Sequence, residues 1–186
     1  KGLKGKQLHN AIPHRRMSAT IYKNYPQGKI TVTDFLLGQY YLYEDALNSQ
    51  EWNIESDSMK VVLGHECQKA TCSFRGRKWT AWFALDVPVS DGPLKFCGLP
   101  GLIMEVYDRG KQYYFCINGM QQVSATPITF GILDKDFKHF QKTDRKDFLL
   151  SKYRYLRNQN SINEASTGIS LGSVDEALKY DLIEKE

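Results

Sequence analysis

A glycine- and proline-rich run near the middle of the chain constrains its fold more than any other segment. Residues 92–103 contain three glycines and two prolines, separated by large apolar side chains. Glycine permits positive φ and close backbone approach, whereas proline fixes φ and removes a hydrogen-bond donor. We therefore predict a rigid connector that leads into a hairpin, with Phe96 and Leu99 in the core. The residues assigned to this structural motif are Gly92, Pro93, Phe96, Gly98, Leu99, Pro100, Gly101, Leu102 and Ile103.

Short runs of alternating apolar and polar residues, separated by turn residues, predict β-strands through most of the chain. The predicted strands span residues 29–35, 38–43, 51–55, 59–63, 66–74, 79–86, 102–107 and 112–117. Tight turns between neighbouring strands make them antiparallel, with turns at residues 64–65, 75–78 and 108–111. The side chains expected to face each other are Phe74 and Trp79, Cys72 and Ala81, Met104 and Phe115, and Val106 and Tyr113.

Helix signals come late in the chain. Thr143 can cap a helix over residues 143–157, because Asp144 stands in its first turn and apolar residues follow at helical spacing. Residues 158–172 are rich in Ser, Asn and Gly, which predicts a mobile loop. The alternation within residues 175–186 favours a closing strand.

These elements indicate a mainly β (α+β) fold class. We expect a curved antiparallel sheet or half-barrel of short hairpin-linked strands with one or two helices, and a closed sandwich is the alternative. A length of 186 residues suits a single domain over residues 1–186 with its own core. No run approaches the roughly 18 apolar residues of a membrane helix, so no transmembrane segment is expected.

The net charge of +4 is unevenly spread. Seven lysines and arginines precede the first acidic residue, Asp34. They stand among Gly, His, Pro and Asn, and not within a recognisable nucleic-acid-binding module. We therefore interpret residues 1–28 as a basic, solvated N-terminal arm, incomplete at its beginning, and expect no nucleic-acid partner.

The four cysteines, Cys67, Cys72, Cys97 and Cys116, form an even set. Their spacing lacks the Cys-x-x-Cys pattern of a redox or zinc motif. One or two structural disulfides in an oxidising compartment are the first interpretation, and buried free thiols are the alternative. Four cysteines permit three complete pairings, and the sequence does not choose among them.

The turn at residues 75–78 offers a candidate ligand-binding site. The guanidinium groups of Arg75 and Arg77 could hold a phosphate or carboxylate, while Trp79 and Trp82 supply an aromatic surface. The alternative is a solvated, charged turn beside tryptophans of the core.

We expect no catalytic residue, metal site or cofactor. The histidines are scattered, and no Gly-x-Ser-x-Gly motif occurs. Cys72 stands near two arginines, which would lower a thiol pKa, but a structural cysteine is favoured because no histidine base is near in sequence. Asp86, Asp91 and Asp108 stand at strand ends or turns, where carboxylates commonly accept hydrogen bonds from the backbone.

Several sequence blocks carry a resemblance to a known family. They comprise residues 52–54, 63–70, 74–83, 86–88 and 91–96, the Gly-Leu-Pro-Gly-Leu-Ile run at residues 98–103, and the ending at residues 178–184. Together they resemble the GLPGLI family of secreted or cell-envelope proteins from Bacteroidetes. The resemblance implies a mostly β domain exported to the periplasm, cell envelope or exterior, with its signal peptide absent from this sequence. It carries over no catalytic residue.

Three functions are carried forward. The first is a non-enzymatic exported domain that binds a small apolar ligand or an envelope protein in the concavity of its sheet. The second is an envelope hydrolase or thiol enzyme, centred on Cys72 or a pair of aspartates. The third is a structural scaffold whose aromatic edges pair with other chains. The oligomeric state does not follow from the sequence.

Overall fold

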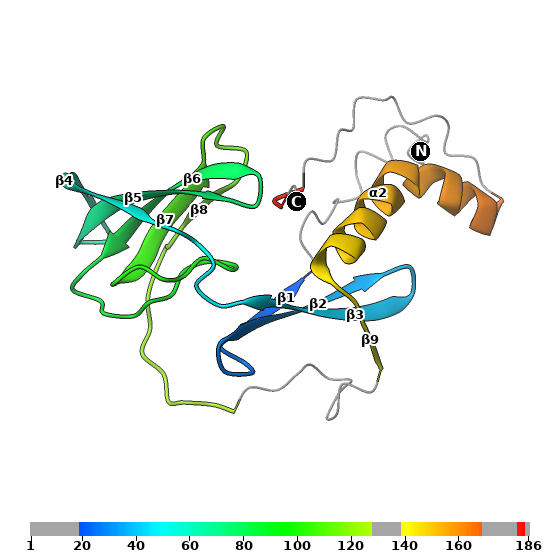
Figure 1. Cartoon of the computed structure of the whole chain (residues 1–186), viewed down its shortest axis with the longest axis horizontal. Helices are drawn as coiled ribbons and strands as arrows, with labels where there is room; N and C mark the ends of the chain where they lie inside the picture. Colours follow the sequence, from blue (N-terminus) through cyan, green and yellow to red (C-terminus); the bar gives the residue numbers. More distant parts are fainter. Residues whose placement is uncertain (1–18, 128–138, 169–181, 185–186) are drawn as a thin grey trace, which may run out of the picture.

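The computed structural model describes residues 19–127, 139–168 and 182–184. Within these ranges the chain forms two β-sheets and one long helix, whose first turns lie beside the smaller sheet (Figure 1). The mainly β fold class predicted from the sequence is confirmed. The strands form two open sheets, however, where the sequence predicts one curved sheet.

The first sheet contains four strands in the order β1-β2-β3-β9. β1 (Thr20–Lys23), β2 (Lys29–Leu36) and β3 (Gln39–Ala46) are antiparallel, whereas β9 (Phe140–Lys142) runs parallel to β3. β1 and β9 escape sequence analysis because strands this short show no clear alternation. The predicted solvated arm is wrong for the residues of β1, which pair with β2; residues 1–18 lie outside the described residues.

The second sheet contains five antiparallel strands in sequence order. They are β4 (Asn53–Val62), β5 (His65–Phe74), β6 (Arg77–Ala84), β7 (Leu102–Asp108) and β8 (Tyr114–Cys116). β4 is one continuous strand where the sequence predicts two. Its register with β5 shifts between Glu55 and Met59, and this irregularity interrupts the alternation that reveals a strand in the sequence.

Two-residue turns connect three of the hairpins. Leu37-Gly38, Leu63-Gly64 and Arg75-Gly76 all have positive φ at both positions. This is the conformation of a type I′ turn, whose twist matches that of the strands it joins. Glycine adopts it at the second position without strain, whereas leucine and arginine at the first position do so at a cost.

The predicted cross-strand pairs are displaced by two residues. Cys72 pairs with Trp79, because the two-residue turn before β6 lies at Arg75-Gly76, one residue earlier than the predicted loop at Gly76-Arg77. Val106 pairs with Phe115. Met104, predicted on the same face as Val106, packs in a separate cluster because the register of β7 shifts beside β6. A displacement by two residues otherwise keeps side chains on the predicted face.

The helix α2 (Arg145–Thr167) begins where the sequence predicts. The N–H of Asp147 donates to Asp144 Oδ1 at 2.9 Å, so this aspartate, and not the threonine before it, caps the helix. The loop predicted over residues 158–172 is wrong as far as residue 167. No glycine or proline follows Asp144 until Gly168, whose φ of +68° suits the end of a helix.

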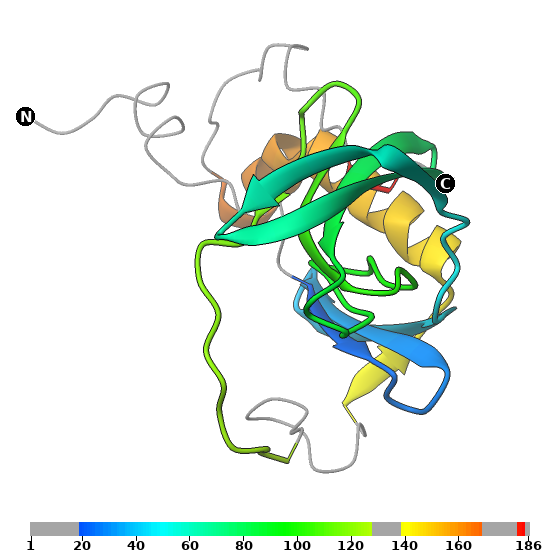
Figure 2. The ribbon, with the colours of Figure 1, turned by 90° about the vertical axis from the view of Figure 1, so that its left-hand side faces the viewer.

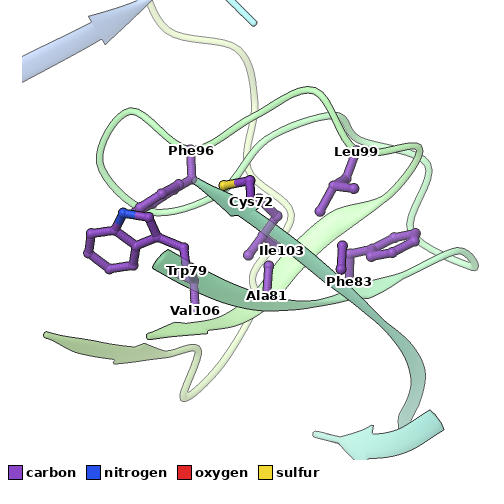
Figure 3. Packing of buried hydrophobic residues seen from close by; sticks show 9 residues of the cluster. Cys72, Trp79, Ala81, Phe83, Phe96, Leu99, Ile103 and Val106 are labelled. Carbon is purple, nitrogen blue, oxygen red and sulfur yellow. The ribbon is translucent and has the colours of Figure 1, made fainter. Parts of the chain in front are cut away.

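The main core cluster lies between the second sheet and the glycine- and proline-rich connector. Phe96 and Leu99 are buried in it, which confirms their predicted place in the core. The rings of Phe96 and Trp79 meet edge to face with their centroids 4.7 Å apart. Figure 3 shows this pair beside Cys72, with Leu99 and Phe83 at the other end of the cluster.

Two glycines of the connector leave no room for a side chain. A Cβ atom on Gly101 would lie 2.0 Å from the carbonyl oxygen of Ala84, and one on Gly92 would lie 2.8 Å from Ile103 Cβ. Real Cβ atoms essentially never lie within 3.0 Å of such neighbours, so any larger residue must displace the surrounding atoms. The packing seen here therefore requires glycine at positions 92 and 101 of the connector.

The connector also joins the two sheets. Lys23 Nζ, at the end of β1, donates hydrogen bonds to the carboxylate of Asp91 and, at 2.8 Å, to the carbonyl oxygen of Phe96. Gln50 Nε2 donates to the carbonyl oxygen of Lys95 at 3.0 Å. Figure 2 shows this part of the chain, in green, lying against the blue strands β1 and β2.

Candidate functional site

A cavity of about 90 Å³ lies where the two sheets and α2 meet. Residues 182–184 lie between the second sheet and α2 and form part of its wall (Figure 1). They make a bend, and most of the strand predicted over residues 175–186 falls outside the described residues. The lining residues are Ala19, Ile21, Val32, Asp34, Tyr43, Phe74, Arg75, Trp79, Leu94, Lys95, Phe96, Phe148, Leu149, Lys152, Leu182, Ile183 and Glu184.

Most of the cavity wall is apolar. Val32 comes from β2, Trp79 from β6, Phe96 from the connector and Phe148 from α2, and all four side chains are buried. A polar group placed among them loses its hydration, so it must find a partner in the protein.

Five charged side chains form a cluster beside these apolar walls. Lys95, Arg75 and Arg145 surround the carboxylates of Asp45 and Glu184, and we call these five residues the inter-sheet charge cluster. Asp45 accepts hydrogen bonds from Lys95 Nζ at 2.7 Å and Arg75 Nη2 at 3.1 Å. Glu184 pairs with Lys95, and its Oε2 lies 3.4 Å from Arg145 Nη1. Three cations and two carboxylates leave one excess positive charge.

Four side chains of the inter-sheet charge cluster are buried, whereas that of Arg75 is 24% exposed. The side chains of Lys95 and Asp45 are 6% and 8% exposed, and that of Glu184 is 10% exposed. Lys95 Nζ also donates to Tyr43 Oη at 3.2 Å. Burial, and then the carboxylates of Glu184 and Asp45, raise the pKa of Tyr43, so its phenol stays neutral and can accept this hydrogen bond.

Arg75 leaves one donor of this cluster unused. Its Nε is buried and donates no hydrogen bond within the described residues, because the nearest oxygen of Glu184 lies 3.9 Å away. An unsatisfied buried donor is costly. One further oxygen atom, from a water molecule, a ligand or a shifted Glu184 carboxylate, would satisfy this donor.

The guanidinium group of Arg77 holds the backbone of residues 182–184. Its Nη2 donates to the carbonyl oxygen of Leu182 at 2.8 Å, and its Nε donates to that of Ile183 at 3.0 Å. The Ile183 side chain packs against the main core cluster. A further hydrogen bond holds the Arg77 side chain in place, because its Nη1 donates to Asp108 Oδ2 at 3.0 Å.

Three of the four residues predicted to bind a ligand lie at the cavity or its wall, and the fourth lies elsewhere. Arg75 and Trp79 line the cavity, and Arg77 binds the segment that forms part of its wall. Trp82 packs in a different cluster, with Lys60 Nζ 4.7 Å from its ring centroid. The tryptophans are three residues apart on one strand, so they face opposite sides of the sheet.

Sequence analysis misses Asp45, Lys95, Arg145 and Glu184. Each of these residues stands in a different segment of the chain, and only the fold brings the four side chains together. Lys95 offers a weak signal, since it is the one charged residue within the connector at residues 92–103. A buried lysine demands a partner, but no local pattern identifies which carboxylate supplies it.

All four cysteines are free thiols in this structure. Cys116 is exposed and the others are buried, and the disulfides expected from the sequence stay a prediction. Cys67 and Cys72 are five residues apart on β5, so they point to opposite faces and pack in separate clusters. Cys97 lies in the connector, its Sγ 3.7 Å from Gln50 Oε1.

The residues considered for catalysis do not meet in one place. Burial raises the pKa of Cys72 to about 12, so its thiol is protonated at neutral pH. Asp86 Oδ2 lies 2.7 Å from His65 Nδ1 at the surface, whereas Asp108 is buried and pairs with Arg77. These two aspartates thus have separate partners.

No helix in the described part of the chain is long and apolar enough to cross a membrane. Within the same residues, no three or more His, Cys, Asp or Glu side chains gather in a way that could hold a metal ion.

Comparison with known proteins gives a short family match and distant structural neighbours. A family model described as a protein of unknown function (Porph_ging) matches residues 75–105, which run from the β5–β6 turn through the connector into β7. Two solved structures of PNGF-II, in the P21 and C2 space groups, are 16% and 17% identical to this chain. They cover 66% and 78% of it with TM-scores of 0.43 and 0.46.

The chain spans only 22% and 27% of the length of those two PNGF-II chains. Comparison with curated proteins gives no match.

Proposed function

We propose that this chain is a non-enzymatic binding domain, which holds an apolar ligand or a segment of a partner protein in the cavity between its sheets. The observation that supports this function is an apolar cavity bordered by the buried inter-sheet charge cluster. Binding sites for small molecules typically combine apolar walls with a few charged groups. The walls favour an apolar ligand body, and the charged groups orient it.

The cavity as it stands is small. Its volume of about 90 Å³ is below the roughly 150 Å³ of an engineered apolar cavity that binds benzene. A larger ligand must therefore take the place of part of the wall. Residues 182–184 are the part held mainly by polar contacts, through Arg77 and the inter-sheet charge cluster.

The enzymatic alternatives have less support. The Cys72 thiol is buried in the main core cluster with a raised pKa, the reverse of what a nucleophile requires. Asp86 and Asp108 have separate partners, so they do not form the paired carboxylates of a hydrolase.

The proposal includes membership of the GLPGLI family and export to the cell envelope. Its support is the series of sequence blocks between residues 52 and 103, part of which the matched family model also covers. The apolar cavity would then serve an envelope ligand or partner protein.

The test uses the neutral fluorescent probe N-phenyl-1-naphthylamine, whose emission rises in an apolar site. This probe is larger than the cavity, so we expect saturable binding to the unmodified chain in which the probe takes the place of residues 182–184. Leu149 lines the cavity, whereas Leu150 beside it on α2 is 47% exposed and does not. The variant Leu149→Trp fills the cavity and should weaken probe binding at least tenfold, and the matched variant Leu150→Trp should leave it unchanged.

Two results would contradict the proposed function. One is the absence of saturable probe binding to the unmodified chain. The other is an equal effect of the two tryptophan variants, which would place the probe elsewhere on the molecule. Circular dichroism of both variants checks that the fold is retained.

A further inference from the structure

The wall segment at residues 182–184 is bound as a peptide ligand would be bound. Arg77 donates to two consecutive backbone carbonyl oxygens, those of Leu182 at 2.8 Å and Ile183 at 3.0 Å. Every peptide carries such carbonyl groups, so this contact recognises a backbone and not a particular side chain. Figure 1 shows the segment lying between the second sheet and α2.

Arg77 is positioned by contacts that do not involve the bound segment. Its Nη1 donates to Asp108 Oδ2 and to Gln112 Oε1, both at 3.0 Å, and its guanidinium carbon lies 4.8 Å from the ring centroid of Tyr113. The side chain is 4% exposed. A planar guanidinium held in this way presents its remaining N–H groups in a fixed direction.

The surfaces that surround residues 182–184 determine which side chains a bound peptide can carry. Leu182 and Ile183 line the apolar cavity, and Ile183 also packs against the main core cluster. Glu184 enters the inter-sheet charge cluster, where Lys95 and Arg145 pair with its carboxylate. Along the bound backbone these surfaces accept, in order, an apolar, an apolar and an acidic side chain.

The charges require an acid at the third position. Without the Glu184 carboxylate, the cations of Arg75, Lys95 and Arg145 would face Asp45 alone, with two positive charges in excess. The unused Nε of Arg75 lies 3.9 Å from Glu184 Oε2 and adds a further donor near this position. A neutral or basic residue here would leave three cations sharing the carboxylate of Asp45, and such an excess of buried positive charge is strongly unfavourable.

We infer that the site between β6 and α2 is a peptide-binding site for an apolar–apolar–acidic sequence, and that residues 182–184 occupy it in this structure. This inference rests on the proposed function and names its ligand class. A peptide of the same pattern from another protein would compete with the chain's own segment. Competition from a tethered segment is strong, because tethering gives an effective concentration in the millimolar range.

The test weakens the binding of residues 182–184 to the site and supplies the same sequence as a separate peptide. The variant Glu184→Lys adds a fourth cation to the cluster and should release the segment while leaving the site intact. A fluorescein-labelled peptide with the sequence of residues 181–186, Asp-Leu-Ile-Glu-Lys-Glu, should then bind at least tenfold more tightly to this variant than to the unmodified chain, measured by fluorescence anisotropy.

Two controls separate recognition from general charge effects. The variant Glu66→Lys makes the same charge change at an exposed position on β5 and should bind the peptide as weakly as the unmodified chain. A peptide in which the first glutamate is replaced by glutamine should lose at least tenfold in affinity for Glu184→Lys. If Glu184→Lys does not fold, Glu184→Gln provides a milder release of the same segment.

The outcomes distinguish this inference from the proposed function. Equal affinity for the two peptides, or equal binding to the Glu184 and Glu66 variants, would overturn the peptide inference. If N-phenyl-1-naphthylamine still binds in the cavity, the proposed function stands without it. If neither the probe nor the peptide binds to any variant, both fail.

Discussion

Gly101 occupies a place that admits no side chain. A Cβ atom there would lie 2.0 Å from the carbonyl oxygen of Ala84 and 2.7 Å from its carbonyl carbon. Backbone atoms of β6 cannot move away as a flexible side chain could. This close approach, more than any freedom of φ, explains why the connector carries glycine before β7.

Replacing Gly101 with alanine should therefore destabilise the protein by about 3 kcal/mol or more, at or above the usual range for overpacking. The matched variant Gly119→Ala adds a methyl group where nothing lies within 4 Å and should change stability by less than about 0.5 kcal/mol. Urea unfolding of both variants measures the difference. Equal stability of the two would show that β6 can shift freely, contrary to the packing described above.

Cys72 should make stability depend on pH in the alkaline range. Its thiol ionises near pH 9 in the unfolded chain, but burial raises the pKa to about 12 in the folded protein. The thiol's contribution is therefore complete below pH 9 and is lost as the pH rises towards 12. Urea unfolding between pH 7 and 10 should show a steeper loss of stability for the unmodified chain than for Cys72→Ala. Parallel pH profiles would contradict the assigned burial.

At the scale of elements, the hairpins were more predictable than their registers. Alternation or, for β3, a high content of aromatic residues identifies β2, β3, β5, β6 and β7. Register depends on which residues form the turn, and the turn before β6 lies at Arg75-Gly76, one residue earlier than predicted. The end of α2 was missed for a related reason, since the polar composition of residues 158–167 resembles a loop and contains no residue that breaks a helix.

The type I′ turn at Leu63-Gly64 carries a strained residue. Leu63 has a φ of +50° and is 49% exposed, so its side chain gains little from packing. Asparagine adopts this conformation more readily and is favoured before glycine in such turns. The variant Leu63→Asn should stabilise the protein by about 0.5–1 kcal/mol, whereas Leu63→Ile should destabilise it, because β-branched residues disfavour positive φ. Thermal unfolding of the two variants decides the sign.

At the scale of the whole molecule, most residues of the candidate site could not be predicted from the sequence. Arg75, Arg77 and Trp79 were identified because they stand together at one turn. The residues that complete the site, Asp45 and Glu184 among them, come from segments far apart in the chain. Only the packing of the two sheets against α2 brings them together, and no local pattern encodes that packing.

The pair of Lys95 and Asp45 links the connector of the second sheet to β3 of the first. Removing one partner of a buried ion pair typically costs about 3–5 kcal/mol. The two single variants should nevertheless differ. Lys95→Met leaves two cations with two carboxylates, whereas Asp45→Asn leaves three cations with Glu184 alone, so Asp45→Asn should be the more destabilising.

A double-mutant cycle on this pair, followed by urea unfolding, should give a coupling energy of about 1.5 kcal/mol or more, because contacting residues in one network are not additive. The exposed pair of Lys29 and Glu44, which joins β2 to β3 within one sheet, is the matched control. Its cycle, with Lys29→Met and Glu44→Gln, should give less than about 1 kcal/mol. If the buried pair were additive to within about 0.5 kcal/mol, the pair would not hold the two sheets together, which would then depend on apolar packing and on other polar contacts such as those of Lys23 and Gln50. The inter-sheet charge cluster would then be free to serve ligand binding without a cost to the fold.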